Sequence, residues 1–417
     1  MSHLLIIESW VEGTGRLLPL TIIGLGHEYT FVTRNPEHYQ QSEAGEKHPI
    51  VQNARQVIQC ETNNLEQLIP KLTKCHQINP FDGVITICDY YVETVAAIAK
   101  SLNLPQAFSK HVALESRKHL VRQALQKAQL ENPQFVIAKN WNEVLQGAHD
   151  IGFPLVIKPS DLASSAFVTL VKNEDELKVA FDKLALFTHN FREQPREAIW
   201  LLEAYIQGDE FSVEACTYNG KTTIIGITDK TVTGQPYFIE DGHMFPAKIS
   251  DSLAQKIKSY VTDVLNALEH EHGITHTEVK VNGDSVKLIE INPRPAGNYI
   301  VELIKQVTGI DLLSVHIGLA INEKPDLSFI NQARGSAAIK FLVPEQTGVV
   351  KSFTGLEQIT RDPNIVRCQF KSIEGQEIST SIDNACYLGH VIAVDEKGNN
   401  ARQFAEAALN KLNIEFE

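Results

Sequence analysis

The segment EVKVNGDSVKLIEINPRPAG, residues 278–297, consists of two apolar-alternating runs joined by a turn and ended by two prolines, which predicts a β-hairpin. Side chains alternate between the two faces of a strand, so Glu290, Asn292 and Arg294 project from one face about 6–7 Å apart. A three-residue loop at 283–285 places Glu278 opposite Glu290. The other face then carries Val279, Val281, Ile289 and Ile291, as a core-facing side should.

Two carboxylates facing each other across a strand pair repel. A cation between them removes the repulsion, and hard oxygen ligands without His or Cys favour Mg²⁺ bound together with phosphates. The hairpin is therefore interpreted as a metal and phosphate site. Two alternatives stay open: a solvated sheet face, or a two-residue Asn-Gly turn that separates the acids unless a bulge restores their pairing.

Composition indicates an enzyme-sized globular protein. The chain has 417 residues, 43% of them hydrophobic and 21% charged, enough for two or three domains. No run of about 18 apolar residues suggests a membrane span, and the first residues resemble a core strand rather than a signal peptide. The net charge of −13 disfavours nucleic acid as a partner. Six scattered cysteines without a C-x-x-C pair predict free, mostly buried thiols and a cytoplasmic location.

The pattern of elements predicts four regions. Residues 1–110 contain strand–helix–strand units typical of a parallel α/β domain. Residues 111–198 begin with a charged helical segment and continue in short strands and helices, whereas residues 199–330 change to successive strands with turns, an α+β pattern. Residues 331–417 contain short strands punctuated by Gly and Pro and end in a helix at 401–412.

A second motif is FPLVIKPSDLASSAFV, residues 153–168. A strand delivers Lys158 within an apolar run, where a buried ammonium needs an anionic partner such as phosphate. The small residues that follow, including Ser164 and Ser165, permit a tight loop whose N–H groups and hydroxyls can hold phosphate oxygens. The alternative is an edge-strand lysine that reaches solvent.

Two further motifs are weaker by themselves. In WLLEAYIQGDEF, residues 200–211, Glu203 and Glu210 flank a turn, and the segment between them can offer backbone groups to an adenine edge while an acid accepts ribose hydroxyls. In SRKHLVRQAL, residues 116–125, Lys118 and Arg122 share one helix face. Ordinary surface charges are the alternative for both.

Taken in order, the four motifs resemble the ATP-grasp superfamily, especially the carboxylate–amine ligases that include bacterial L-amino acid ligases. The resemblance covers nearly the whole chain. It implies an ATP-grasp fold of α/β and α+β type: a Rossmann-like N-terminal domain (1–110), a central lid subdomain (111–198), a catalytic subdomain (199–330) and a β-rich C-terminal subdomain with a terminal helix (331–417).

The resemblance also implies residue roles. Lys118, Lys158, Ser164 and Ser165 contact ATP phosphates, Glu203 with the backbone of Ala204 and Ile206 holds adenine, and Glu210 holds the ribose. Glu278, Glu290 and Asn292 ligate Mg²⁺, with Mn²⁺ as a substitute. Arg294 stabilises charge on the transferred phosphoryl group. The implied reaction forms an acyl phosphate from a substrate carboxylate, and an amine then displaces phosphate to give an amide.

A fifth segment, GQPYFIEDGHMFPAK, residues 234–248, resembles the ligases' acceptor loop. Glu240 and His243 are expected to bind the amine substrate, with His243 assisting proton removal or binding phosphate. Arg294, Gly297 and Asn298 complete the expected substrate site, with Asn298 as a selectivity position. A structural loop histidine remains the alternative for His243.

Several features limit this interpretation. The loop after Lys158 lacks the glycines usual in the family. The EGTG turn near the N-terminus is an incomplete dinucleotide motif, and Arg34 replaces the acid expected for a ribose hydroxyl. Gly273 should separate His270 and His272 from His276, which disfavours a zinc site.

The expected partners are small-molecule carboxylates and amines, such as amino acids, without nucleic acid or membrane, and the family's habit suggests a homodimer. Two other functions stay open. One is a carboxylase of the biotin carboxylase or purine-synthesis type, and the other is an NAD(P)-binding oxidoreductase or sensor.

Overall fold

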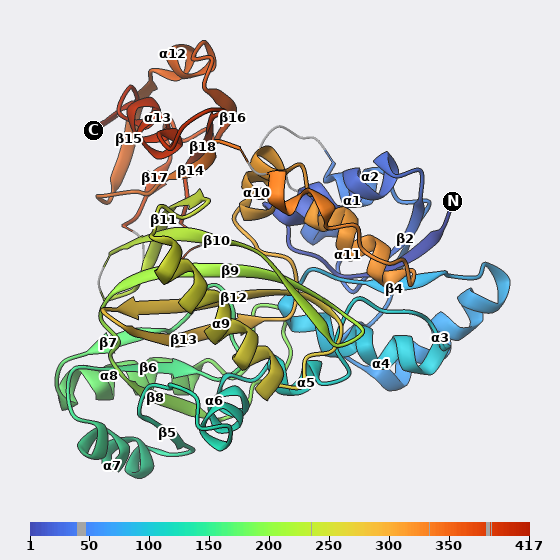
Figure 1. The fold of residues 1–417 in the computed structure, drawn as a ribbon, viewed down its shortest axis with the longest axis horizontal. Coiled ribbons are helices and arrows are strands. Elements are labelled where there is room, and N and C mark those ends of the chain that lie inside the picture. The colour runs from blue at the N-terminus through green and yellow to red at the C-terminus, as the bar shows by residue number, and fades with distance from the viewer. Residues whose placement is uncertain (40–46, 235, 333, 381–383, 385) are drawn as a thin grey trace.

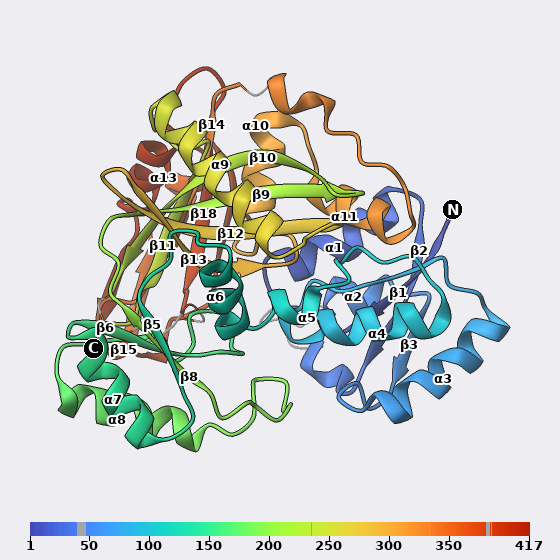
Figure 2. The same cartoon turned by 60° about the horizontal axis from the view of Figure 1, so that its bottom comes forward.

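The computed structural model describes residues 1–39, 47–234, 236–332, 334–380, 384 and 386–417. Their strands form four sheets, of which an eight-stranded sheet is the largest. Figure 1 shows the large sheet at the centre, the N-terminal domain to one side in blue and cyan, and a smaller green sheet below. The rotated view in Figure 2 shows α5 (Val112–Glu115) beside the N-terminal domain and α6 (Lys118–Lys127) beside the smaller sheet.

The N-terminal domain has a parallel sheet with strand order β3-β2-β1-β4. Every residue of β1 is buried, as expected for a strand covered by helices on both faces. α4 ends where Asn103 adopts a left-handed conformation. The strands are β1 His3–Ile7, β2 Glu28–Thr33, β3 Gln56–Gln59 and β4 Gly83–Ile85; the helices are α1 Thr14–Gly24, α2 Pro49–Gln52, α3 Leu65–Ile78 and α4 Val92–Leu102, with 3-10 turns η1 Pro36–Tyr39 and η2 Asp89–Tyr91.

The carboxyl end of β1 is filled by the chain's own side chains. Glu8 is 1% exposed and accepts hydrogen bonds from Thr33 Oγ1 at 2.9 Å and from Tyr39 Oη at 2.7 Å. Arg192, from a distant segment, is also buried and donates to the carbonyl of Ser9. Parallel sheets of this kind bind dinucleotides at these strand ends. Internal contacts here leave little room for one, which weighs against the oxidoreductase interpretation.

The smaller sheet is antiparallel in order β5-β8-β6-β7. The side chains of Asn140 and Asn173 cap its two helices, each accepting from the N–H of a glutamate three residues later. β8 lies in this sheet, so the sheet extends past the expected division at residue 198. The elements are β5 Phe135–Ala138, α7 Trp141–Ile151, β6 Leu155–Pro159, β7 Thr169–Val171, α8 Glu174–Leu186 and β8 Trp200–Ala204.

The large sheet has the order β13-β12-β9-β10-β11-β14-β18-β16. α9 packs a buried face that includes Ile257, Val261 and Leu265 against it, and Ser250 caps this helix. The strands are β9 Asp209–Tyr218, β10 Lys221–Thr233, β11 Ile239–Phe245, β12 Gly273–Asn282, β13 Ser285–Asn292, β14 Ser336–Leu342, β16 Ile365–Phe370 and β18 Gly389–Asp395; the helices are α9 Asp251–Ala267, α10 Ile300–Thr308 and α11 Leu312–Ala320, followed by η3 Ser328–Gln332.

The C-terminal region shares this sheet. β14, β16 and β18 continue it, so residues 331–417 are joined to the catalytic region by strand pairing. The expected terminal helix 401–412 ends at Leu409, and a strand follows it. The remaining elements are β15 Gly348–Thr354, α12 Leu356–Thr360, β17 Glu377–Ile378, α13 Ala401–Leu409 and β19 Asn413–Phe416.

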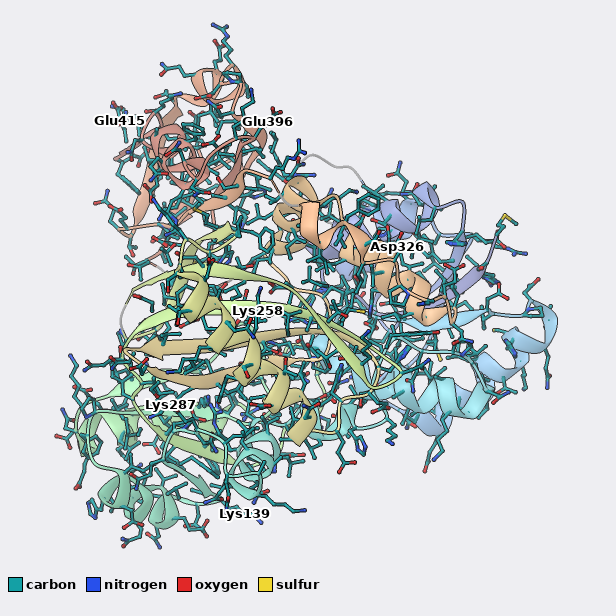
Figure 3. All side chains as sticks on the ribbon, viewed as in Figure 1. Lys139, Lys258, Lys287, Asp326, Glu396 and Glu415 are labelled. Carbon is teal, nitrogen blue, oxygen red and sulfur yellow. The ribbon has the colours of Figure 1, made fainter. Side chains whose placement is uncertain are left out.

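Charged side chains lie mostly at the surface. Lys139, Asp326, Glu396 and Glu415 are exposed and point outward in Figure 3. None of the six cysteines forms a disulfide, but only Cys88 and Cys216 are buried, so the expectation of mostly buried thiols was wrong. Among the described residues, no helix is both long and apolar enough to cross a membrane.

Candidate active site

The β12–β13 hairpin brings the two acids of residues 278–297 together. Its connection is a two-residue turn, since Asn282 pairs with Ser285, and the predicted three-residue loop is wrong. A β-bulge next to Glu278 then shifts the register by one residue, so Glu278 pairs with Glu290. The predicted pairing of the acids is confirmed, and the bulge is what produces it.

Val279, Val281 and Ile291 are buried as predicted, whereas Ile289 is only half-buried.

The bulge also presents a backbone acceptor to two cations. The carbonyl of Ile289 accepts from Arg122 Nη2 at 3.0 Å and from Lys158 Nζ at 3.4 Å. The hairpin is thus tied to α6 and to the smaller sheet.

Lys118 contacts the second acid of the pair. Its Nζ lies 3.2 Å from Oε2 of Glu290 and donates to the carbonyl of Leu162 at 2.7 Å. The charged segment forms two helices rather than one, because α5 ends at Glu115 and α6 begins at Lys118. Lys118 therefore lies at a helix start, next to the paired acids.

Lys158 is buried between strands and does not reach solvent. β6 has β7 on one side and β8 on the other, and Lys158 is 4% exposed. Its Nζ lies 2.7 Å from Oε2 of Glu203, whose Oε1 accepts from Arg122 Nε at 2.5 Å. Burial raises the pKa of Glu203, but the two cations outweigh it and lower that pKa to about 2. Burial lowers the pKa of Lys158.

The loop after Lys158 reaches left-handed backbone conformations without glycine. Ser164, Ser165 and Phe167 have φ values of 59°, 56° and 61°, where a Cβ is unfavourable. Asn384, from the C-terminal region, donates to Ser165 Oγ at 3.5 Å and accepts from the N–H of Glu240 at 3.0 Å. This loop and β11, the strand that carries Glu240, therefore share Asn384 as a neighbour.

Arg294 lies beyond the end of β13, which stops at Asn292, so the strict alternation predicted through Arg294 does not hold. Its Nε donates to Oδ1 of Asp89 at 2.7 Å, and Trp10 Nε1 donates to Oδ2 of Asp89 at 3.1 Å. Burial lowers the pKa of Arg294, but Asp89 outweighs it and the pKa lies above its usual value. The N-terminal domain thereby orients this guanidinium.

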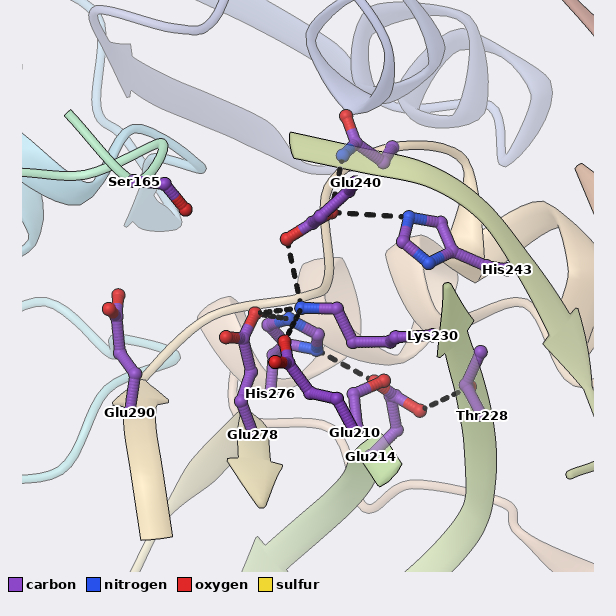
Figure 4. A network of polar contacts seen from close by, with 12 residues as sticks. Ser165, Glu210, Glu214, Thr228, Lys230, Glu240, His243, His276, Glu278 and Glu290 are labelled. Carbon is purple, nitrogen blue, oxygen red and sulfur yellow. Dashed lines mark hydrogen bonds and ion pairs between the residues drawn. The ribbon is translucent and has the colours of Figure 1, made fainter. Parts of the chain in front are cut away.

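A buried lysine on β10 joins three carboxylates, as Figure 4 shows. The Lys230 side chain is fully buried, and its Nζ lies 2.6 Å from Glu278, 2.9 Å from Glu240 and 3.3 Å from Glu210. Burial opposes charge on these groups. Lys230 nevertheless lowers the pKa of Glu240 well below its usual value and that of Glu278 to about 2, whereas burial keeps the pKa of Glu210 raised.

Glu240 has few free hydrogen-bonding positions. Its Oε1 accepts from Lys230, and its Oε2 accepts from Asn298 Nδ2 at 2.9 Å. His243 Nε2 lies 3.3 Å from the same Oε2. The ring of His243 is buried; Nε2 has this contact with Glu240, and Nδ1 has no hydrogen-bond partner among the described residues. Gly297 has open space where a Cβ would stand.

Two hollows lie along residues expected to bind the nucleotide and the metal. A cavity of about 490 Å³ lies between the N-terminal domain and the hairpin, lined by residues that include Asp89, Lys118, Arg122, Glu290 and Asn292. A second, of about 180 Å³, is lined in part by Ala204, Ile206 and Lys287. The N–H of Ala204 already donates to the carbonyl of Gln134 at 2.9 Å. This N–H is therefore not available to an adenine ring.

The oxygen ligands fit Mg²⁺ rather than zinc. His270 pairs with Glu115 and His276 with Glu214, so the three histidines do not share one site. Nowhere in the described part of the chain do three His, Cys, Asp or Glu side chains form a complete metal site. Mg²⁺ commonly takes only one or two carboxylates and completes its shell with water and phosphate oxygens. Glu278, Glu290 and the amide of Asn292 match this pattern.

Sequence reasoning missed three of these residues: Asp89, Lys230 and Asn384. Lys230 stands between Asp229 and Thr231 in β10, so the sequence around it does not indicate a buried ammonium that needs carboxylate partners. Asp89 and Asn384 meet the site only through domain packing, and nothing near them in the sequence indicates this.

Three family models match parts of the chain: an ATP-grasp N-terminal domain over residues 24–106, an ATP-grasp domain over 151–302 and an L-amino acid ligase C-terminal domain over 340–417. Among curated relatives, an uncharacterised protein of Sinorhizobium fredii is 27% identical and covers 86% of this chain and 73% of its own length. The alanine–anticapsin ligase of Bacillus amyloliquefaciens is 25% identical and covers 82% of this chain and 78% of its own length.

Solved structures share the fold. The L-amino acid ligase of Bacillus licheniformis superposes with a TM-score of 0.82 at 20% identity, over 100% of this chain and 99% of that chain. The biotin carboxylase of Campylobacter jejuni superposes with a TM-score of 0.70 at 18% identity, over 100% of this chain and 92% of that chain.

Proposed function

Because this chain is an ATP-grasp protein resembling the L-amino acid ligases, we propose that it joins the carboxylate of an amino acid to an amino acid or other amine, with release of ADP and phosphate. The observation that supports this most is the pairing of Glu278 with Glu290, with Lys118 in contact with Glu290 and Arg294 beyond the strand end.

ATP is proposed to lie between the hairpin and the smaller sheet. Lys118 and Lys158 would exchange their present carboxylate partners, Glu290 and Glu203, for phosphate oxygens. Ser164 and Ser165 would add hydroxyl and N–H donors. Glu203 with the backbone of Ala204 and Ile206 would hold adenine, and Glu210 would accept ribose hydroxyls.

Glu278, Glu290 and Asn292 would hold Mg²⁺, or Mn²⁺ in its place. The bound ion supplies charge neutralisation on the phosphate oxygens. Lys230 contacts Oε1 of Glu278, and no hydrogen bond from the described residues goes to Oε2, which could face the ion.

Arg294 would bind the anions that meet during the first step. A substrate carboxylate oxygen attacks the γ-phosphorus, the bond to the β-phosphate oxygen breaks, and an acyl phosphate and ADP result. Asp89 and the carbonyl of Pro295 engage Nε and Nη1 of Arg294, and no hydrogen bond to a described residue engages Nη2. That nitrogen can donate to the developing charge.

The amine would bind near Glu240, His243, Gly297 and Asn298. Its nitrogen attacks the acyl carbon, and the carbon–oxygen bond to phosphate breaks. His243 has an unpartnered ring nitrogen to take the amine proton. A substrate ammonium would share Glu240 with Lys230 and Asn298, which favours an amine that needs only one position on this carboxylate.

Substrate dependence tests the proposal. The purified protein is incubated with ATP, Mg²⁺ and pairs of amino acids; phosphate release is measured and the product is identified by mass spectrometry. Phosphate release that requires two amino acids supports the ligase. Release that requires bicarbonate instead supports a carboxylase, an alternative that shares the fold but not the matched ligase C-terminal domain.

A further inference from the structure

His276 lies between two carboxylates next to the paired acids. Its Nδ1 is 2.7 Å from Oε1 of Glu214, and its Nε2 is 3.1 Å from Oε1 of Glu278. His276 is 5% exposed, so water competes little for these contacts. Figure 4 shows the ring between the two acids, next to Lys230.

Strand pairing produces this arrangement. Across β12 and β9, His276 pairs with Glu214, and Glu278 pairs with Ser212. Residues two apart on a strand project from the same face. The ring therefore reaches Glu214 across the sheet and Glu278 along its own strand.

Glu214 is held rigidly behind the ring. It is fully buried; its Oε1 accepts from Ser212 Oγ at 2.9 Å, and its Oε2 accepts from Thr228 Oγ1 at 3.0 Å. Together with His276, three donors fix this carboxylate. A buried acceptor that is fully satisfied sets the orientation of the group bound to it.

On the other side, the ring helps to fix one oxygen of Glu278. Lys230 Nζ and His276 Nε2 both approach Oε1, at 2.6 and 3.1 Å. No hydrogen bond from the described residues goes to Oε2. A carboxylate tied by one oxygen presents the other in a defined direction, which is how partners behind metal ligands commonly act.

We propose that His276 is a positioning residue that orients the Glu278 carboxylate for the divalent metal, with Glu214 as its support. This inference rests on the proposed function, because it takes Glu278 as a ligand. A purely structural histidine would contribute to stability but would leave metal affinity unchanged when replaced by a residue that preserves the fold.

Two amide substitutions separate these roles. His276→Asn places its amide near the position of Nδ1 and keeps a donor to Glu214, but it does not reach Glu278. His276→Gln extends to the position of Nε2 and keeps a donor to Glu278. The matched control is His270→Ala, because His270 is also buried against a carboxylate, Glu115, at 2.9 Å, but does not contact Glu278.

The readout is Mn²⁺ binding in the presence of a non-hydrolysable ATP analogue, with free Mn²⁺ measured by electron paramagnetic resonance and folding checked by near-UV circular dichroism. We expect His276→Asn to raise the Kd for Mn²⁺ about tenfold or more. His276→Gln should raise it less, and His270→Ala should not change it.

The inference is overturned if His276→Asn binds Mn²⁺ as tightly as the wild type, or if His276→Gln weakens binding at least as much as His276→Asn. Failure of the wild type itself to bind Mn²⁺ with the nucleotide analogue is a different result. It contradicts the proposed function and removes the basis of this inference with it.

Discussion

The Nε of Arg294 lies 2.7 Å from Oδ1 of Asp89, a residue 205 positions earlier in the chain. This ion pair joins the end of the acidic hairpin to the N-terminal domain. In the proposed mechanism, the N-terminal domain would therefore act by orienting the guanidinium of Arg294.

Replacing Asp89 with asparagine tests this role. Asp89→Asn keeps the size of the side chain but removes the charge that orients Arg294. We expect kcat to fall about tenfold to hundredfold, because small misplacements of a catalytic group have effects of this size, while ATP affinity stays nearly constant. Asp263→Asn, on the exposed face of α9, is the control. An unchanged kcat would contradict the assignment.

Lys230→Met should destabilise the protein strongly. The side chain is fully buried among three carboxylates, and removal of one partner from a buried charge cluster costs about 3–5 kcal/mol. Urea unfolding measures the effect. The control, Lys305→Met, removes a half-exposed lysine that pairs with Asp311 and should cost less than about 1 kcal/mol. If both variants lost a similar amount of unfolding free energy, the contacts of Lys230 with its three carboxylates would contribute little to stability.

The sequence predicted most of the fold that matters for the site and part of the site itself. The parallel N-terminal domain, the acidic hairpin and the strand that carries Lys158 follow from apolar periodicity and turn residues, which act locally. The pairing of Glu278 with Glu290 was predicted through a three-residue loop, and the two-residue turn with a bulge that produces it was the alternative left open. The sequence did not decide between the two, because a bulge depends on how β13 packs against other elements.

Contacts between distant segments were beyond sequence reasoning. Asp89 and Asn384 have no local feature that marks them, and they reach the site only after domains pack. Arg122 was visible as a cation beside Lys118, but its buried bond to Glu203 required the smaller sheet to be placed against α6. The roles proposed for nucleotide, metal and substrate residues stay predictions.

Acid should weaken the protein partly through Glu203. Its pKa is lowered to about 2 in the folded state, below that of an unfolded glutamate, so its ion pairs stabilise the fold above about pH 4.5 and this contribution is lost as pH falls toward 2. Urea unfolding at pH 6 and at pH 3 measures the effect. Between these two pH values, the free energy of unfolding should fall less in Glu203→Gln than in the wild type. Equal losses would mean that Glu203 is not the group responsible.

Glu290→Ala should remove activity with little effect on stability. Its side chain is 20% exposed, and within the described part of the chain its ion pair is with Lys118 alone, so the fold depends on it little. We expect turnover to fall about hundredfold or more and the midpoint of thermal unfolding to change slightly. Asp284→Ala, in the exposed turn of the same hairpin, is the control and should stay active. Near-normal turnover in Glu290→Ala would contradict the site.

Oxygen transfer tests the central claim most directly. Once a substrate pair is known, the acid substrate is supplied with ¹⁸O at both carboxylate oxygens, and the released phosphate is analysed by mass spectrometry. An acyl phosphate intermediate passes one carboxylate oxygen to phosphate, so the account predicts one ¹⁸O atom in each phosphate released. Unlabelled phosphate, with the amide product formed, would contradict it.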